Sequence, residues 1–409
     1  MPQSKSAKPK RILMLLENSG FPEDCRVASE AFALVEAGYS VRVICPKDKY
    51  TKKRFEVVSG VPTYRYPRPP EWGGFLGYVF EYGYSLAATL LISIWIFLRH
   101  GFDALHVHTP PDMYVAIGYI YRILGVKYVQ DHHDLSPELY QGQTYENNTG
   151  IVYKALRWFE RRSCRLASQI IATNETQRGI EIERCGVDRE RTNVVRNGPK
   201  LDRFRQEEPL AELRKEGHTT FGYLGCIGFQ DGVDQFIHSL HSLKTDFSRD
   251  DFVGVIIGDG PAVSDLKSLA KELEIEDKVH FAGYQRGESL LRHLSSCDVG
   301  VTPDPPSAYN MTCTMIKTMD YMAMSLPIVG FDMPEHRYSA GEASLYAVPG
   351  DQKDFARCMK TLMDDPEERK RRGMLGRQRV ENELAWEFQA KSLLNTYSKL
   401  FGVAESAQS

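Results

Sequence analysis

The chain has 409 residues, of which 42% are hydrophobic and 26% are charged, and this composition excludes a disordered or fibrous protein. Lysine and arginine together number 51, aspartate and glutamate 54, and the net charge of −3 argues against a dedicated nucleic-acid binder. At about 150 residues per domain, the length predicts two or three domains.

The eight cysteines include no CxxC pair, which argues against a zinc ribbon or a dithiol redox motif. We therefore expect free thiols, several of them buried, in a reducing compartment. Residues 1–11 are polar and basic, and the apolar run that follows them is short. The sequence therefore predicts no signal peptide and a cytoplasmic location.

Short apolar segments typical of strands alternate with helical stretches along the chain. Their continuous apolar character predicts parallel sheets that helices cover on both faces, that is, an α/β fold. The predicted strands cover residues 12–16, 41–45, 104–108, 127–130, 169–173 and 193–196 in the first half, and 220–225, 253–258, 278–283, 298–303, 326–331 and 344–349 in the second.

A polar segment near residues 205–218 separates the two series of strands and predicts a domain boundary. We expect a basic tail (1–11), a first Rossmann-like domain (12–210), a second one (211–380) and a final helix (381–401). Two doubly wound domains in one chain predict a cleft, with ligands bound at the carboxyl ends of the strands.

Polar residues follow the first predicted strand, where a helix is about to begin. The NH groups at a helix N-terminus suit anions or sugar hydroxyls, and Asn18, Gly20 and Arg26 are placed to face such a ligand. An ordinary strand–helix turn explains this loop equally well. The loop lacks a GxGxxG pattern, which argues against dinucleotide binding.

Histidines lie at the ends of two further strands. Segment 131–134 contains two adjacent histidines between two aspartates, and adjacent residues of a strand point to opposite faces, so the two histidines are not expected to share a metal ion. We expect one of them to serve acid–base chemistry or hydrogen bonding; a structural histidine satisfied by a carboxylate is the alternative. His106 and His108, on the preceding strand, share a face.

Two strands of the second half end in glycine-rich loops. Paired glycines let a backbone approach a phosphate closely, although a plain turn is the commoner outcome of so short a pattern. The polar and glycine residues of these loops are Gly225, Gly228 and Gly232 in the first and Gly258, Asp259 and Gly260 in the second.

Segment 310–332 places Thr314, Lys317, Asp320 and Tyr321 at helical spacing. Lys317 can neutralise a diphosphate as a point charge, and Asp320 can accept hydrogen bonds from ribose hydroxyls. The alternative is a surface ion pair between Lys317 and Asp320, which would contribute little. The surrounding methionines are expected to pack in the core.

The order of these segments resembles that of the family 4 retaining glycosyltransferases with the GT-B fold. The similarity extends over roughly residues 11–400 and rests on a set of motifs, each weak alone: NSGFPEDCRV, HVHTPPD, DHHDLSPE, RNGPKLDRF, GVDQFI, IGDGP and IKTMDYMAMSLPIV. The resemblance implies two Rossmann-like domains facing a cleft. It places a nucleotide-sugar against the second domain, an acceptor against the first, and a last helix, around Trp386, that returns to the first domain.

The resemblance also assigns roles by position. His133 matches the family histidine that contacts the transferred sugar, and Asp320 matches the second acid of the Glu-x7-Glu pattern, which holds the ribose. Loop 258–260 matches the loop beside the donor, and Gly225 and Gly232 match the strand exit near the diphosphate.

These roles, together with the patterns above, predict the whole site. The predicted catalytic residues are His133 and Lys317. The predicted donor site comprises Gly225, Gly228, Gly258, Asp259, Gly260, Thr314 and Asp320. The predicted acceptor or cleft residues are Asn18, Gly20, Arg26, Asp134, Glu138, Arg196 and Asn197. Neither a metal ion nor a cofactor is expected.

The sequence departs from the family pattern around the diphosphate. Position 312 is threonine where the first Glu of the pattern would fall, and Cys226 and Asp231 stand where the family has an arginine and a lysine. Fixed charges that stabilise a leaving group are a large catalytic term, so Lys317 is the expected substitute, with the two predicted cleft arginines as others. A subset of the family resembles this chain in its QDG loop and in a lysine three residues before the acid, so we expect an active enzyme.

The implied reaction is transfer of a sugar, with retention, from a UDP- or GDP-sugar to a glycan or lipid-linked acceptor for a surface polysaccharide. The leaving phosphate would deprotonate the acceptor. No cluster of metal-binding carboxylates is visible in the sequence, which fits a metal-independent hexosyltransferase. Two alternatives stay open: a GT-B-fold sugar-nucleotide epimerase or hydrolase, and a non-catalytic GT-B partner subunit.

Three segments of the first half suggest contact with a membrane. Residues 86–98 are apolar but fall short of a span of about 20 residues, so a buried or interfacial helix is predicted. Residues 72–84 are rich in aromatic side chains, and a helix predicted at 151–166 has a basic face made of Lys154, Arg157, Arg161 and Arg165. Such a face suits an anionic membrane, although a solvated basic face is the alternative. With the basic tail, these segments predict peripheral binding at the inner face of the cell membrane.

Overall fold

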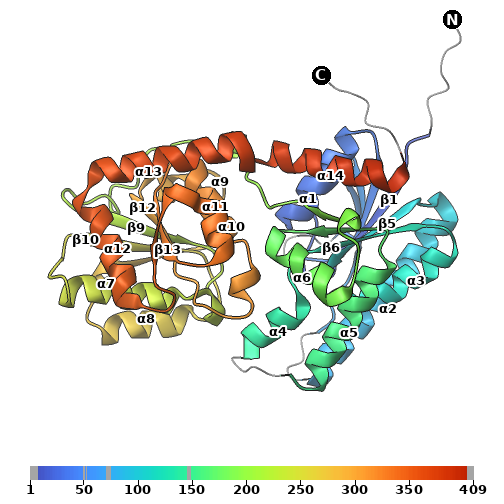
Figure 1. Cartoon of the computed structure of the whole chain (residues 1–409), viewed down its shortest axis with the longest axis horizontal. Coiled ribbons are helices and arrows are strands. Elements are labelled where there is room, and N and C mark those ends of the chain that lie inside the picture. Colours follow the sequence, from blue (N-terminus) through green and yellow to red (C-terminus); the bar gives the residue numbers. More distant parts are fainter. Residues whose placement is uncertain (1–7, 49–50, 52, 71–74, 145–148, 403–409) are drawn as a thin grey trace, which may run out of the picture. The chain divides into compact units, whose positions relative to one another are not determined.

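The computed structural model describes residues 8–48, 51, 53–70, 75–144 and 149–402. Most of the predicted basic tail and residues 72–74 of the aromatic segment lie outside these ranges. The chain divides into two compact units (Figure 1). The first comprises the residues up to 140, 147–195 and those from 390 onwards, and the second comprises 141–146 and 196–389. The boundary predicted at 210/211 thus falls inside the second unit.

The first unit is built on an eight-stranded sheet with the order β3-β4-β2-β1-β5-β6-β7-β8. All neighbouring strands are parallel except β3 and β4, which form an antiparallel hairpin at one edge. The strands are β1 (Arg11–Leu15), β2 (Ser40–Pro46), β3 (Phe55–Val58), β4 (Val61–Tyr66), β5 (Ala104–Thr109), β6 (Lys127–His132), β7 (Gln169–Ala172) and β8 (Thr192–Val194).

Helices connect the parallel strands of this sheet: α1 (Cys25–Glu36), α2 (Phe75–His100), α3 (Val115–Ile123), α4 (Ser136–Thr144), α5 (Ile151–Leu166) and α6 (Glu175–Cys185). Asp24 caps the start of α1 by accepting a hydrogen bond from the Val27 N–H. Helices α2, α3 and α5 bury apolar side chains in one core cluster with β1, β5, β6 and β7. They therefore cover the same face of the sheet.

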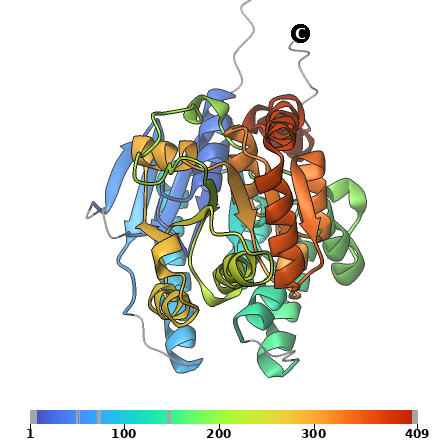
Figure 2. The same cartoon turned by 90° about the vertical axis from the view of Figure 1, so that its left-hand side faces the viewer.

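The second unit is built on a six-stranded parallel sheet with the order β11-β10-β9-β12-β13-β14. Alternate residues of β10 enter two different apolar clusters, one with α7 and α8 and one with α9 and α10, so helices cover both faces (Figure 2). The strands are β9 (Thr219–Leu224), β10 (Phe252–Ile257), β11 (Val279–Gly283), β12 (Val299–Thr302), β13 (Ile328–Phe331) and β14 (Ser344–Ala347).

The helices of the second unit are α7 (Val233–Thr245), α8 (Val263–Glu272), α9 (Gly287–Ser295), α10 (Ile316–Ala323), α11 (Pro334–Ala340), α12 (Gln352–Asp364) and α13 (Pro366–Arg379). One π-helical turn (Val380–Leu384) follows α13, and α14 (Trp386–Phe401) begins in this unit and continues into the first. The stretch 366–401, which the sequence predicts as helical, is therefore interrupted near Ala385.

The α/β prediction is confirmed strand by strand, since all twelve predicted strands coincide with strands of the two sheets. The prediction missed the β3–β4 hairpin, although the Ser59–Gly60 pair between two apolar runs is a turn signal. The helix predicted at 151–166 is confirmed as α5. The expectation that Thr314 lies on a helix is wrong: it precedes Met315, the extended N-cap of α10.

Candidate functional site

Two glycine loops meet at the carboxyl ends of β9 and β10. Gly225 (φ 154°) and Gly258 (φ 151°) have backbone conformations that side chains rarely adopt. A Cβ atom on Gly258 would lie 1.8 Å from the Gly225 carbonyl oxygen, and one on Gly260 would lie 2.4 Å from that of Ile227. These glycines are therefore required for backbone-to-backbone packing of the two loops.

Lys317, from α10, reaches this pair of loops. Its Cε atom lies 3.5 Å from the Cβ position of Gly225, and its ammonium donates a hydrogen bond of 2.8 Å to Asp304. The ammonium also lies 4.6 Å from the centre of the Tyr223 ring. Burial would lower the pKa of Lys317, but the carboxylates of Asp304 and Asp231 outweigh burial and raise it. The lysine is therefore a buried, permanently charged cation.

The two positions that depart from the family pattern have local roles. Asp231 accepts a hydrogen bond of 2.8 Å from the Gly228 N–H and so closes the turn that leads into α7. Cys226 is exposed, and its carbonyl oxygen accepts a hydrogen bond of 2.7 Å from the Tyr223 hydroxyl. Neither residue brings a positive charge, so Lys317 is the cation that the structure places beside Gly225.

Asp320 lies one turn after Lys317 on α10 but does not pair with it, because Lys317 pairs with Asp304. Burial raises the pKa of the Asp320 carboxyl to about 7. Among the residues that the structure describes, none is recorded as donating a hydrogen bond or forming an ion pair with this carboxyl. The Asp320 residue is partly exposed, so water satisfies the carboxyl in the free protein and a ligand hydroxyl can take the place of that water.

Arg196 belongs to the second unit, where it is almost fully buried. Its guanidinium donates a hydrogen bond of 3.1 Å to Glu335 and lies 3.9 Å from the centre of the Tyr338 ring. Thr314 lies within 3.5 Å of both Arg196 and Glu335. The two residues predicted for different parts of the site, Arg196 and Thr314, are thus neighbours.

A buried ionic network occupies the centre of the first unit. Arg26 donates hydrogen bonds of 2.7 and 3.2 Å to the two carboxylate oxygens of Asp131, and it lies 3.2 Å from Glu30. Burial would raise the pKa of Asp131, but Arg26 and the neighbouring histidines bring it well below its usual value. Burial raises the pKa of Glu30 well above its usual value. Arg26 is therefore engaged within the fold by an ionised Asp131.

Histidines extend this network to the surface. His108 Nδ1 lies 3.0 Å from Asp131 Oδ2 and 3.0 Å from His133 Nε2. Burial lowers the pKa of His108 well below its usual value, so its ring is neutral. Because an ionised Asp131 only accepts, we assign the proton to His108 Nδ1, which makes His133 Nε2 an acceptor and leaves the proton of a neutral His133 on Nδ1. The His133 side chain is 14% exposed.

Four of these buried side chains have the spacing of metal ligands. Glu30, His106, His108 and Asp131 bring ligand atoms within 4.8 Å of one another. Arg26 already supplies the positive charge at this point through Asp131 and Glu30. A divalent ion about 4 Å from a guanidinium would be repelled by about 8 kcal/mol at an effective dielectric constant of 20. The donor set therefore suits a metal ion poorly while Arg26 is in place.

The remaining predicted residues of the first unit are in structural contacts or near the surface. His132 lies between Glu181 (2.7 Å) and Asp112 (3.2 Å), and these carboxylates outweigh burial and raise its pKa well above its usual value. Glu138 forms an ion pair with Arg184. Asn18 is exposed. As expected, His132 and His133 have different partners, and the rings of His106 and His108 stack, with centres 4.3 Å apart.

Two family models together span most of the chain. A model described as a glycosyl transferase 4-like domain matches residues 26–198, and one described as glycosyl transferases group 1 matches residues 204–379. The chain belongs to the family 4 glycosyltransferases. The predicted membership of the family 4 glycosyltransferases is thereby confirmed. The two matches fall on the two sheet-containing units of this glycosyltransferase.

One sequence relative supports the same assignment, and two solved structures share the fold. The 2-deoxystreptamine glucosyltransferase of Streptomyces kanamyceticus is 23% identical over 295 residues, which are 69% of this chain and 73% of that enzyme. Sucrose-phosphate synthase from Thermosynechococcus elongatus superimposes with a TM-score of 0.79 at 17% identity, covering 97% and 100% of the two chains. Anabaena Alr3699/HepE in complex with UDP-glucose gives a TM-score of 0.72 at 17% identity, covering 95% and 99%. The fold of this glycosyltransferase is GT-B.

Proposed function

We propose that this glycosyltransferase moves a hexose, with retention, from a UDP- or GDP-sugar to a glycan or lipid-linked acceptor in surface polysaccharide synthesis. The observation that carries the proposal is Asp320, a partly exposed carboxyl on α10 with a raised pKa and no hydrogen-bond donor among the described residues. A ribose offers two adjacent hydroxyl donors, which would satisfy that carboxylate. Asp320 is therefore proposed to hold the ribose of the nucleotide.

Lys317 is proposed to neutralise the diphosphate without a metal ion. It is charged, buried and adjacent to Gly225, which follows β9 directly. A positive charge fixed beside the leaving phosphate stabilises the transition state more than the ground state. Asp304 orients this ammonium, because Lys317 Nζ lies 2.8 Å from Asp304 Oδ1.

The transfer itself needs no protein nucleophile. The acceptor hydroxyl oxygen bonds to the anomeric carbon on the face from which the nucleoside diphosphate leaves, and a phosphate oxygen of the leaving group takes the hydroxyl proton. His133 is proposed to donate its Nδ1–H to a hydroxyl of the transferred sugar, because its Nε2 faces His108. This orientation depends on the buried Asp131 network.

A nucleotide-sugar titration across pH tests the proposed donor site. The carboxylate of Asp320, with a pKa of about 7, should accept the ribose hydroxyls only when ionised, so wild-type affinity should rise between pH 6 and 8. Phosphodiesters of a nucleotide-sugar do not titrate in this range. The Asp320→Asn variant should bind at least about tenfold more weakly at pH 8 and show no such rise. Calorimetry with UDP-glucose and GDP-mannose measures the affinity of wild type and of the variant at each pH.

Protein stability supplies the control. A carboxyl whose pKa rises from 3.8 to about 7 on folding stabilises the native state below pH 3.8, and that contribution is lost as pH rises to 7. Asp320→Asn should therefore unfold at higher denaturant concentration than wild type at pH 8, and the gain should shrink towards pH 4. Weaker binding by a less stable variant would contradict the assignment.

The replacement of two family cations by Cys226 and Asp231 favours one alternative, a non-catalytic partner subunit. A partner subunit would bind the nucleotide-sugar but release no nucleoside diphosphate with any acceptor. An epimerase or hydrolase would instead convert the sugar or release it without an acceptor. Product analysis after incubation with and without acceptor separates the three functions.

We also propose that the first unit binds the membrane surface peripherally. The length and composition of Val79–His100 in α2 would suffice to cross a bilayer, with a mean hydropathy of 1.4 and 22% of its apolar 18-residue window buried. Helix α2 joins β4 and β5 of one sheet, and its Thr89 and Ser93 bond to Tyr114 and Tyr121. A helix that is bonded to the first unit in this way is better suited to lie at the membrane–water interface than to cross the membrane.

Sedimentation with liposomes tests this location. The apolar face of α2 and the basic face of α5 should together take the protein into the pellet with vesicles containing anionic lipid at low salt. Neutral vesicles should retain clearly less protein, and 0.5 M salt should release most of it. A protein that stays in the supernatant with anionic vesicles would overturn the proposed membrane contact.

A further inference from the structure

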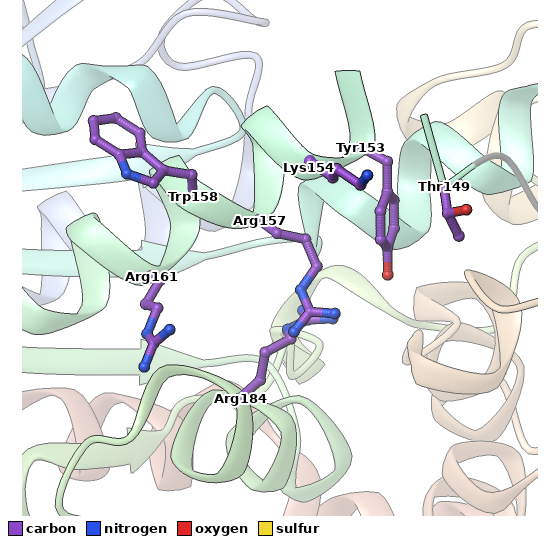
Figure 3. Close-up of a pocket in the computed structure, with 7 residues that line it drawn as sticks. All are labelled: Thr149, Tyr153, Lys154, Arg157, Trp158, Arg161 and Arg184. Atoms are coloured by element: carbon purple, nitrogen blue, oxygen red, sulfur yellow. The ribbon is translucent and has the colours of Figure 1, made fainter. Parts of the chain in front are cut away.

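A pocket lies in the first unit along α5, outside the residues assigned to the donor, the transferred sugar or the acceptor (Figure 3). We propose that it binds the phosphate or diphosphate group of a lipid-borne ligand. The inference rests on the proposed function, because it specifies the chemical class of the lipid-linked acceptor. The pocket has a volume of about 410 Å3, and Tyr153, Lys154, Arg157, Trp158, Arg161 and Arg184 line it.

The pocket carries an uncompensated positive charge. Lys154, Arg157 and Arg161 are exposed and follow one another at intervals of three and four residues, so they project from one side of α5. Within the described part of the chain, no acidic side chain pairs with any of the three. Like charges at this spacing repel one another, so an anion that bridges them would relieve the repulsion.

Arg184 lines one side of the pocket in a fixed position. This residue of α6 forms ion pairs with Glu138 and Glu160, which hold its guanidinium in place. Burial raises the pKa of Glu160 to about 7, so this carboxyl is only partly ionised near neutral pH. The pair of acids therefore compensates Arg184 but leaves the charge of the three α5 cations unmatched. A group with two or more negative charges matches that excess, which favours a phosphate monoester or diphosphate.

The surroundings of the pocket favour a ligand with an apolar chain. Trp158, a wall residue, is 53% exposed, and Ile151 at the start of α5 is 84% exposed. Helix α3, which packs against α5, exposes Ile123 to 86%. A phosphate bound by the cations would thus have apolar side chains on the same helices to receive a hydrocarbon chain. A free phosphate would make no use of that surface.

Tryptophan fluorescence of the full-length protein tests the pocket. Geranyl diphosphate is the probe, with inorganic pyrophosphate and geraniol as the two comparisons. Geranyl diphosphate should quench the emission of Trp158, and the Trp158→Phe variant should lose that response. Pyrophosphate should bind at least about tenfold more weakly, and geraniol should not compete. Equal affinity for pyrophosphate would overturn the lipid-borne ligand, and equal affinity for geraniol would overturn the phosphate site.

Two charge-matched double variants separate the pocket from general surface charge. Arg157→Ala/Arg161→Ala removes two cations that line the pocket, and it should weaken geranyl diphosphate binding at least about tenfold. Arg122→Ala/Lys127→Ala removes two exposed cations from α3 and β6 that do not line it, and it should change binding less than about threefold. Equal losses in the two variants would overturn the site.

A separate measurement of nucleotide-sugar binding distinguishes failure of the pocket assignment from failure of the proposed function. The donor residues lie in the second unit, so Arg157→Ala/Arg161→Ala should bind UDP-glucose or GDP-mannose as wild type does. If wild type binds the nucleotide-sugar but geranyl diphosphate leaves Trp158 unquenched, the pocket assignment fails while the proposed function stands. If Trp158 responds and no nucleotide-sugar binds, the proposed donor site fails instead.

Discussion

Lys317→Met is expected to abolish donor binding and to lower the free energy of unfolding by about 3–5 kcal/mol, because it leaves the buried Asp304 without a counter-charge. Asp304 is only 1% exposed, so water cannot replace the lost ammonium. A loss of activity in this variant alone would not distinguish a catalytic cation from a structural one.

The double variant Lys317→Met/Asp304→Asn makes that distinction. It removes both charges of the pair, so most of the lost stability should return, since replacing a buried ion pair by neutral groups is often close to neutral. Donor binding should stay lost if the ammonium neutralises the diphosphate. Denaturant unfolding and calorimetry with the nucleotide-sugar measure the two quantities on the same protein.

An exposed pair on the same unit provides the matched control. Lys353 lies 3.3 Å from Asp246, and both side chains are well exposed. Lys353→Met/Asp246→Asn should change neither stability nor donor binding appreciably, because exposed ion pairs contribute about 0–1 kcal/mol. Recovery of nucleotide-sugar binding in Lys317→Met/Asp304→Asn would contradict the role of Lys317, since no ammonium would remain there.

The sequence predicts the two sheets well because their strands are buried on both faces. Such strands are short, continuous apolar runs, and their signal does not depend on distant contacts. The β3–β4 hairpin was missed because it lies at a sheet edge, where exposed and buried residues alternate. Its exposed residues, such as Phe55 and Val57, weaken the distinction between a strand and a loop.

Partners distant in the chain could not be predicted in the same way. Lys317 was identified from its place beside Asp320, yet its ammonium pairs with Asp304, thirteen positions away and outside α10. Arg26 pairs with Asp131, at a separation of 105 residues. In both pairs a cation on a helix meets an aspartate at or just after the end of a strand, and sequence spacing does not encode which side chains meet there.

The second large effect on stability is expected for Asp131→Asn, in the buried ionic network of the first unit. Asp131 is fully buried and ionised, and it accepts hydrogen bonds from Arg26 while His108 lies 3.0 Å away. Removing its charge leaves the Arg26 guanidinium buried and undercompensated. The free energy of unfolding should fall by about 3–5 kcal/mol, which for a unit of this size corresponds to about 10 °C or more in Tm.

The charge of Asp131 should also make the free energy of unfolding depend on pH in the acid range. The pKa of Asp131 is lowered on folding, so its contribution to stability is present above its unfolded value near 3.8 and is lost as pH falls through the folded value. Burial also lowers the pKa of His106 and His108, so stability begins to fall below pH 6.5 as these rings gain protons more readily in the unfolded chain. The difference between wild type and Asp131→Asn should therefore be large at pH 7 and shrink below pH 4.

Glu30→Gln is the matched control, since it removes a carboxyl that faces the same guanidinium at 3.2 Å. Burial raises the pKa of Glu30, and neither carboxyl oxygen has a recorded hydrogen-bond donor, so glutamine resembles the protonated form and should cost less than about 1 kcal/mol. Sugar transfer should also separate the variants, because only Asp131 holds the His108 proton that orients His133. If the two variants lose stability equally, Arg26 is compensated by both acids together, and the assignment of His133 Nδ1 as the donor to the sugar loses its basis.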